Sequence, residues 1–264
     1  MQCNDAQLIF FSPTKTTMQI VDYVADGLGC GTSRLDLTFP AEDVAEAAGD
    51  LAIIGVPVYA GRAAGLAVER LKERVRGDGR PAVLVVVYGN RDYEDALIEL
   101  RDLAVELGFV PVAAGAFIGQ HTYSSDEKPV APGRPDGVDA TKASDFGAAV
   151  AAKLGGIEAL DAMPELTVPG NFPYRDGTKP NGLAPVTLPD LCTLCGECAK
   201  MCPSQVITVT DEAVETDGDN CIRCAACIRA CPTQARVWDS QKIADINDFL
   251  YTKCSARREP ETFL

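Results

Sequence analysis

Eight cysteines fall in two runs that share one spacing. The first run, CTLCGECAKMCP, spans residues 192–203, and the second, CIRCAACIRACP, spans residues 221–232. Both read C-x2-C-x2-C-x3-C-P, a spacing typical of [4Fe–4S] ligation, in which the fourth cysteine of each run binds the cluster of the other. We therefore expect two clusters with crossed ligands, one on Cys192, Cys195, Cys198 and Cys231, the other on Cys221, Cys224, Cys227 and Cys202.

Structural zinc is the alternative for so many cysteines, since zinc sites usually take cysteines as separated pairs. A third cysteine at the same spacing, present in both runs, has no use in a tetrahedral zinc site and favours iron–sulfur. A disulfide framework is not expected, because the sequence shows no export signal. Three further cysteines, Cys3, Cys30 and Cys254, stand alone and are expected to be plain thiols.

The composition is that of a globular protein with room for two domains. The chain has 264 residues, of which 47% are hydrophobic and 23% charged, and its formal net charge is −14. An acidic surface repels phosphate backbones and anionic lipids, so we expect no nucleic-acid or membrane partner. No apolar run is long enough to span a bilayer. We expect a cytoplasmic protein.

The first 160 residues alternate short apolar runs with longer amphipathic stretches, which is typical of βαβ units. Apolar runs this continuous predict parallel strands covered by helices on both faces, that is, a doubly wound α/β sheet. A short helical turn is also expected at 41–49. The predicted strands are 7–12, 33–38, 51–56, 82–88 and 110–118, and the predicted helices are 15–28, 62–76, 91–107 and 139–154.

The pattern changes after Gly155. Residues 163–190 contain six prolines, so this stretch cannot form a long helix or a central strand. Short apolar stretches follow the two cysteine runs at 206–209 and 235–238 and predict small paired strands, and 239–251 predicts a closing helix. We expect a first domain at 1–160, an extended linker at 161–187 and a cysteine domain at 188–264.

Short hydroxyl side chains gather where the first helix should begin. The segment FSPTKTTMQIV, residues 11–21, follows the first predicted strand directly. A helix N-terminus offers free amides and a positive dipole end to a phosphate, and hydroxyls can complete its shell. Ordinary helix capping explains the same residue types. Both interpretations stay open for Ser12, Thr14, Thr16 and Thr17.

Two later loops are expected to meet this segment. In a doubly wound sheet with strand order 2-1-3-4-5, ligands bind beyond the carboxyl ends of strands one and three. The loops 55–65 and 88–96 leave strands three and four at that edge. Tyr59 and Tyr93 offer flat faces for an isoalloxazine ring, although aromatic residues in loops also serve for packing. Arg91 could hold the flavin or a carboxylate of a partner, or be a solvated charge.

The chain resembles the flavodoxin–ferredoxin fusion proteins of anaerobic bacteria and archaea, the ferrodoxin-type fusions. The motifs that carry the resemblance are FSPTKTT, GVPVYAGR, YGNRDYEDA, GQHTYS, GRPD, PGNFPY and the two cysteine runs. It implies a flavodoxin-like five-stranded sheet of order 2-1-3-4-5 that carries flavin mononucleotide (FMN), followed by a small α+β bacterial two-cluster ferredoxin. The expected FMN contacts are Ser12, Thr14, Lys15, Thr16, Thr17, Pro57, Val58, Tyr59, Ala60, Gly61, Gly89, Asn90, Arg91 and Tyr93.

Lys15 and His121 differ from the other residues of these loops. Flavodoxin-like phosphate loops commonly carry glycine where this chain has Lys15, whose backbone must therefore avoid positive φ or bear strain. We expect its ammonium group to bind the FMN phosphate.

His121, the single histidine, lies in the loop after the fifth predicted strand. A lone histidine is usually packed or solvated, although its ordinary pKa would suit proton exchange with a flavin.

These features together predict an electron-transfer protein that exchanges electrons between FMN, two [4Fe–4S] clusters and an external redox protein, with no catalytic residue. One alternative is an FMN-dependent reductase of a small organic substrate fed through the clusters, with the loop 120–138 as its lid. A second alternative is a cluster-binding regulatory or assembly protein whose flavin site is empty. The sequence leaves the direction of electron flow open.

Overall fold

The computed structural model describes residues 1, 3–41, 48–177 and 181–264, so the expected turn at 41–49 falls largely outside the described residues. The first 155 residues alternate strands and helices as the sequence predicts. The elements are β1 (Asp5–Phe10), α1 (Thr16–Leu28), β2 (Gly31–Asp36), β3 (Leu51–Tyr59), β4 (Arg62–Ala63), α2 (Gly65–Arg74), β5 (Pro81–Tyr88), α3 (Ala96–Glu106), β6 (Val110–Ile118) and α4 (Gly137–Gly155).

Five parallel strands form the large sheet in the order β2-β1-β3-β5-β6, which confirms the predicted flavodoxin-like order. Two short antiparallel strands, which were not predicted, extend this five-stranded parallel sheet. β4 pairs with the end of β3, and β11 (Glu261–Phe263) pairs with the outer edge of β6. Strands this short have no alternating pattern that would reveal them in the sequence.

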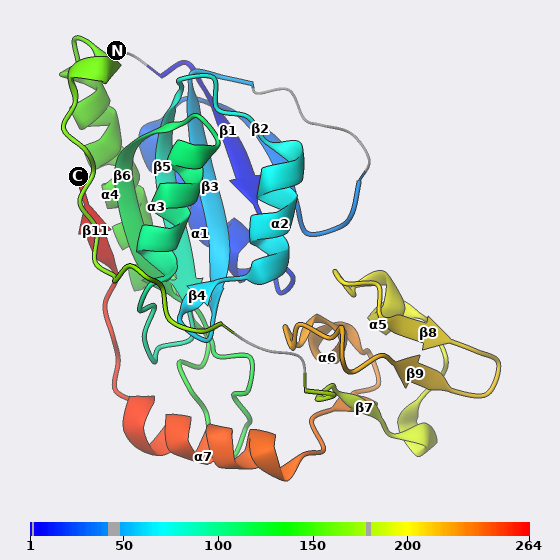
Figure 1. Ribbon diagram of the computed structural model, residues 1–264. Helices are drawn as coiled ribbons and strands as arrows, with labels where there is room; N and C mark the ends of the chain where they lie inside the picture. Colours follow the sequence, from blue (N-terminus) through cyan, green and yellow to red (C-terminus); the bar gives the residue numbers. More distant parts are fainter. Residues whose placement is uncertain (2, 42–47, 178–180) are drawn as a thin grey trace.

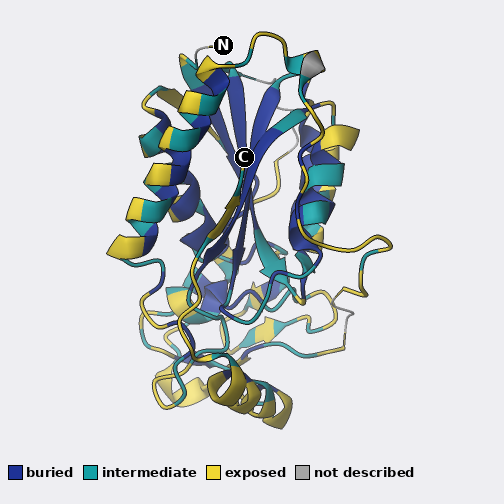
Figure 2. Cartoon of the chain, turned by 90° about the vertical axis from the view of Figure 1, so that its left-hand side faces the viewer, coloured by how far each residue is buried: buried dark blue, intermediate teal, exposed yellow. Residues whose placement is uncertain are grey.

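Helices cover both faces of this sheet (Figures 1 and 2), which is why its central strands are apolar throughout. α2 and α3 pack on one face and α1 and α4 on the other. α1 and α4 cross with their backbones in contact: a Cβ on Gly147 would lie 2.0 Å from the carbonyl oxygen of Val24. Among the described residues, no helix has both the length and the apolar character needed to cross a membrane.

The cysteine domain is small and built from paired short elements. β8 pairs with β9 and β10 pairs with β7, both antiparallel, so strands occur after both cysteine runs where the sequence predicts them. Its elements are β7 (Val186–Thr187), α5 (Glu197–Lys200), β8 (Ile207–Val209), β9 (Val214–Thr216), α6 (Ala226–Ala230), β10 (Arg236–Val237) and α7 (Gln241–Cys254), with a 3-10 turn at Pro189–Leu191. Another 3-10 turn, Leu160–Ala162, follows α4 and precedes the proline-rich segment.

The two parts of the chain are fastened to each other. The proline-rich segment is held on the start of α3, where the Asp95 carboxylate accepts hydrogen bonds from the backbone amides of Asn171 (2.9 Å) and Arg175 (2.8 Å). The buried Arg70 of α2 donates through Nη2 to the carbonyl oxygen of Pro203, just after the first cysteine run, at 2.7 Å. After α7 the chain returns to the large sheet as β11 (Figure 1).

Candidate cofactor sites

Two small cavities lie inside the cysteine domain, and each is lined by four cysteines. Three of the four come from one run and the fourth comes from the other run. These are the two sets that the sequence predicts for crossed ligation. Cavity A is lined by Cys192, Cys195, Cys198 and Cys231, and cavity B by Cys202, Cys221, Cys224 and Cys227.

The backbone around both cavities shows the same pattern of residues in the left-handed conformation. Such residues between right-handed ones turn successive N–H groups to one side, an arrangement found at phosphate and iron–sulfur sites. Two of these amide groups already donate to cysteine: Leu194 to Cys192 Sγ (3.5 Å) and Ala235 to Cys231 Sγ (3.2 Å). Positive φ occurs at Leu194, Gly196 and Gln205 in the first half and, 29 positions later in each case, at Arg223, Ala225 and Gln234.

Four thiol groups and inward-facing amides in each cavity fit a [4Fe–4S] cluster, whose sulfur atoms accept N–H hydrogen bonds. Burial raises the pKa of the Cys224 thiol to about 12, so this cysteine needs a cationic partner such as iron to be held as a thiolate. Within the described ranges, no three histidine, cysteine or acidic side chains are placed to hold a single metal ion.

A pocket of about 60 Å3 lies at the start of α1. Its wall includes Thr14, Thr16 and Thr17 from the hydroxyl-rich loop and Pro57 from the end of β3. The Thr14 and Thr16 hydroxyl oxygens are 3.4 Å apart, so both can reach one anion. We call this space the inner pocket; its hydroxyls and the helix start suit a phosphate group.

The structure separates the capping and ligand interpretations of this loop. Ser12 does not line the inner pocket, and its buried hydroxyl accepts a hydrogen bond from the Met18 amide of α1 at 3.0 Å. Ser12 therefore caps the helix. Thr14, Thr16 and Thr17 line the pocket and make no such bond to the first turn of α1.

Lys15 is the N-cap residue of α1, and its φ is 64°, so it occupies the left-handed region that glycine enters freely. Its side chain is exposed and does not line the inner pocket. The role of phosphate ligand therefore stays a prediction, in which the ammonium group acts from the rim of the pocket.

Replacing Lys15 by glutamine tests this role. Loss of an exposed charge near the phosphate is expected to weaken FMN binding by about 1 kcal/mol, roughly fivefold, in low salt, and the loss should shrink as salt is added. Lys15→Gly removes the same charge but relieves the left-handed backbone, so it should bind FMN no more weakly than Lys15→Gln. Fluorescence titration with FMN measures both. An unchanged dissociation constant in Lys15→Gln at low salt would contradict the ligand role.

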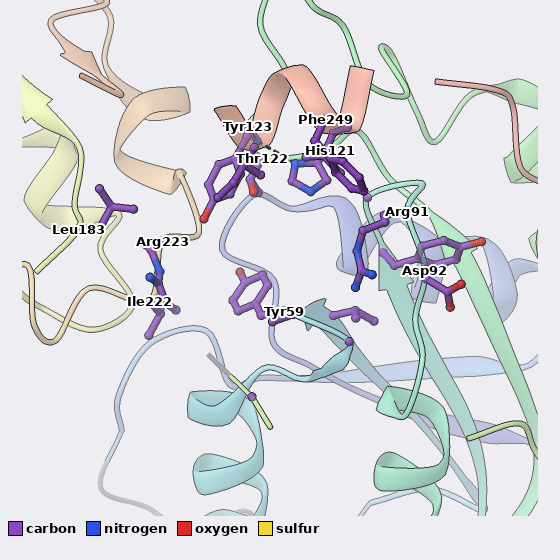
Figure 3. Close-up of a pocket in the computed structure, with 18 of the residues that line it drawn as sticks. Tyr59, Arg91, Asp92, His121, Thr122, Tyr123, Leu183, Ile222, Arg223 and Phe249 are labelled. Atoms are coloured by element: carbon purple, nitrogen blue, oxygen red, sulfur yellow. Dashed lines mark hydrogen bonds between the residues drawn. The ribbon is translucent and has the colours of Figure 1, made fainter. Parts of the chain in front are cut away.

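A cavity of about 610 Å3, here called the wide cavity, adjoins the inner pocket (Figure 3). Tyr59, Gly89 and His121 line both spaces. Ile222 and Arg223 of the second cysteine run and Phe249 of α7 also line the wide cavity (Figure 3). The wide cavity has a volume usual for small-molecule sites, and a flavin ring placed in it would extend from a phosphate in the inner pocket.

Several predicted contacts do line these spaces. Pro57 lines the inner pocket alone; Ala60, Gly61 and Arg91 line the wide cavity alone. Val58, Tyr59 and Gly89 line both. A Cβ on Gly89 would lie 2.4 Å from Cδ2 of His121, so only glycine allows the histidine ring to lie against the end of β5.

The structure does not bring Tyr93 or Asn90 to either space. Tyr93 is buried beside Tyr88, with ring centroids 5.5 Å apart, and its hydroxyl donates to Glu261 of β11 at 2.9 Å. The Asn90 amide donates to the carbonyl oxygens of Cys254 (2.5 Å) and Ala256 (2.9 Å). Both residues hold the last part of the chain against the sheet domain.

The loop after β6 adds three wall residues that were not among the expected contacts, His121, Thr122 and Tyr123. The Nδ1 atom of His121 accepts a hydrogen bond from the Tyr123 amide at 3.0 Å, so the single proton of the neutral ring is on Nε2. The Tyr123 ring packs against His121 at a tilt of 54° and meets Trp238 edge to face, both at 5.3 Å between centroids. Aromatic rings thus run from the wide cavity to the cysteine domain.

Burial, assisted by the nearby charge of Arg91, lowers the pKa of His121 to about 4. The ring is therefore neutral at physiological pH. We expect His121→Gln and the unaltered chain to share one pH profile of FMN affinity from pH 5.5 to 8, and to diverge only as the pH falls toward 4. Fluorescence titration at each pH tests this. A difference between the two profiles with its midpoint near 6.5 would show that His121 titrates as an ordinary histidine.

A further cavity of about 800 Å3 lies between α2 and the cysteine domain. It is lined by Arg62, Arg70 and Pro203, and it meets the wide cavity at Tyr59. None of its lining residues comes from the hydroxyl-rich loop or from the loop after β5. It therefore reaches the end of β3 at Tyr59 but lies away from the ends of β1 and β5.

Comparison with known proteins identifies the cysteine domain. The family model of the 4Fe-4S dicluster domain matches residues 184–254, from just before β7 to the end of α7. This part of the chain is an iron–sulfur domain. A search of curated proteins with the whole sequence finds no match.

Solved structures of flavodoxins match the sheet domain. The oxidised flavodoxin 1 of Bacillus cereus is 15% identical, with 56% of this chain and 97% of that chain covered and a TM-score of 0.41. A flavodoxin of Streptococcus pneumonia TIGR4 is 19% identical, with coverage of 56% and 99% and a TM-score of 0.40. The fold assignment itself rests on the strand order of the large sheet.

Proposed function

We propose that this chain is an electron-transfer protein of the flavodoxin–ferredoxin fusion type, which exchanges electrons between FMN, two [4Fe–4S] clusters and an external redox protein. The observation that carries the proposal is the shared wall of the wide cavity. Tyr59 and Gly89 lie at the carboxyl ends of β3 and β5 in the sheet domain, whereas Ile222 and Arg223 lie between two cysteines of cavity B. FMN accepts one or two electrons and each cluster accepts one. A chain that holds both kinds of cofactor can therefore connect one-electron with two-electron transfer.

The positions of the cysteines favour an order of cofactors. Cavity B is next to the wide cavity: Ile222 lines both, and Tyr59 lies close enough to Cys224 for the thiol to affect its pKa, which burial raises. In cavity A, Cys195 is exposed, and the exposed side chains of Val186, Leu188 and Leu191 precede the first run. We place the external protein at cavity A and propose that a basic surface on it complements the acidic chain.

The covering of the wide cavity favours a carrier over a reductase. A reductase would need an open space above a bound flavin ring, whereas α7 lines the wide cavity and its Phe249 forms part of the wall. The loop 120–138 is fixed to α7, because Asn247 accepts from the Ser125 hydroxyl (3.3 Å) and donates to the Lys128 carbonyl oxygen (3.1 Å). An ion pair between Lys128 and Asp248 adds to this attachment.

The test is a measurement of cofactor content and electron exchange in anaerobically purified protein. We expect one FMN and about eight irons per chain. After partial photoreduction, electrons should redistribute between flavin and clusters at a rate independent of protein concentration, since both lie in one chain. Full iron with no bound FMN would support the regulatory alternative. Rapid oxidation of the reduced protein by a small organic acceptor, with no protein acceptor present, would support the reductase.

A further inference from the structure

Arg236 on β10 is a buried cation without an anionic partner in the described part of the chain. Its side chain is in the interior, with the residue only 2% exposed. Nη1 donates to the Thr187 hydroxyl at 2.7 Å, and Nη2 donates to the Thr216 hydroxyl at 2.9 Å. Among the residues that the structure describes, the Nε–H group has no hydrogen-bond partner.

A buried guanidinium group whose hydrogen-bond partners are only hydroxyl groups is energetically unfavourable. A buried charge is normally paired with an opposite charge, because hydroxyl groups replace only part of the hydration that the guanidinium loses. The guanidinium group of arginine stays protonated in proteins, so the positive charge remains in the interior. The surroundings of Arg236 must therefore supply negative charge of another kind.

Both cysteine cavities reach this residue. Arg236 lines cavity A together with Cys198. On its other side it approaches cavity B, with Nη2 at 3.9 Å from Cys227 Sγ and hydrogen-bonded to Thr216, which lines cavity B. Burial raises the pKa of the Cys198, Cys221 and Cys227 thiols, and the charge of Arg236 opposes that rise at each of them.

We infer that Arg236 is a shared counter-ion between two cluster sites and raises the reduction potential of both. This inference rests on the proposed function, because it requires clusters in cavities A and B. A [4Fe–4S] cluster with four thiolate ligands is an anion, and reduction adds a further negative charge. A fixed cation in a low-dielectric interior stabilises the reduced form more than the oxidised form.

The test compares two replacements of Arg236 with a matched surface control. Arg236→Gln removes the charge, Arg236→Lys keeps it, and Lys200→Gln removes a charge from the same domain where the side chain is 69% exposed. Iron content is measured first, and both potentials are then determined by redox titration followed by paramagnetic resonance. In Arg236→Gln we expect each cluster to be reduced with an equilibrium constant about tenfold smaller, which is a fall of about 59 mV for one electron. Lys200→Gln should shift both potentials far less than Arg236→Gln, because solvent screens its charge.

The outcomes for the Arg236 variants distinguish a shared counter-ion from a residue needed only for packing. Full iron and unchanged potentials in Arg236→Gln would overturn the inference, and a fall at one cluster alone would overturn the shared role. If Arg236→Gln fails to retain clusters, Arg236→Lys decides: retention with potentials near those of the unaltered chain supports the counter-ion role, and failure of both variants shows that packing matters and not charge. Absence of about eight irons from the unaltered chain would instead refute the proposed function.

Discussion

Replacing Cys202 by alanine is expected to remove the cluster of cavity B and to leave the cluster of cavity A in place. Cys202 belongs to the first run by sequence but lines the cavity of the second, beside Cys221, Cys224 and Cys227. The iron content should fall from about eight to about four per chain. Because cavity B adjoins the wide cavity, electron exchange between the remaining cluster and FMN should be lost or greatly slowed.

Cys231→Ala is the matched control, since it removes the corresponding cysteine of the other run. It should halve the iron as well, but it should spare cavity B and its electron exchange with FMN. Alkylation of exposed thiols followed by mass spectrometry identifies which cysteines have lost their iron. Among the eight cysteines of the two runs, those that react in Cys202→Ala should be Cys221, Cys224 and Cys227, whereas Cys3, Cys30 and Cys254 are expected to react in every variant. Reactive Cys192, Cys195 and Cys198 in that variant would show that each run binds its own cluster.

The sheet domain was predictable because its signals are local. Continuous apolar runs such as Ala82–Val87 are buried along their whole length, as strands of a covered parallel sheet must be. The pairing of cysteines in cavities A and B also follows from a spacing rule that needs no knowledge of distant contacts. By contrast, β11 is three residues long and owes its position to contact with β6, which lies more than 140 residues earlier in the chain.

The residues of the candidate flavin site were predictable only where they follow directly on a parallel strand of the sheet. Thr14, Tyr59 and Gly89 follow strands whose carboxyl ends meet at one edge of the sheet, so topology alone brings them together. Tyr93 and Asn90 leave the same edge, but they contact residues of the chain end that are 164 or more positions away. No local pattern distinguishes a tyrosine that faces a cavity from one that packs on a returning strand.

Replacing Thr14 and Thr16 together by valine is expected to weaken FMN binding about a hundredfold. Both hydroxyls lie at the inner pocket, 3.4 Å from each other, and Thr16 is only 9% exposed. Each hydrogen bond to a charged group contributes about 1.5 to 3 kcal/mol, so the loss of two corresponds to a factor of about a hundred or more. Valine preserves most of the side-chain volume, so the pocket keeps its shape. Equilibrium dialysis with FMN measures the change, and an unaltered iron content shows that the cysteine domain is intact.

Ser12→Ala separates loss of a phosphate ligand from loss of a helix cap. Its hydroxyl lies in the same loop but accepts from the Met18 amide, so its removal should destabilise the start of α1 by about 1 kcal/mol. FMN affinity should then change far less than in the double valine variant. If Ser12→Ala weakened FMN binding as much as the double valine variant does, order at the start of α1 would account for the effect. If the double valine variant retained full affinity, the phosphate would have to bind outside the inner pocket, and the wide cavity would lose the feature that orients a flavin ring within it.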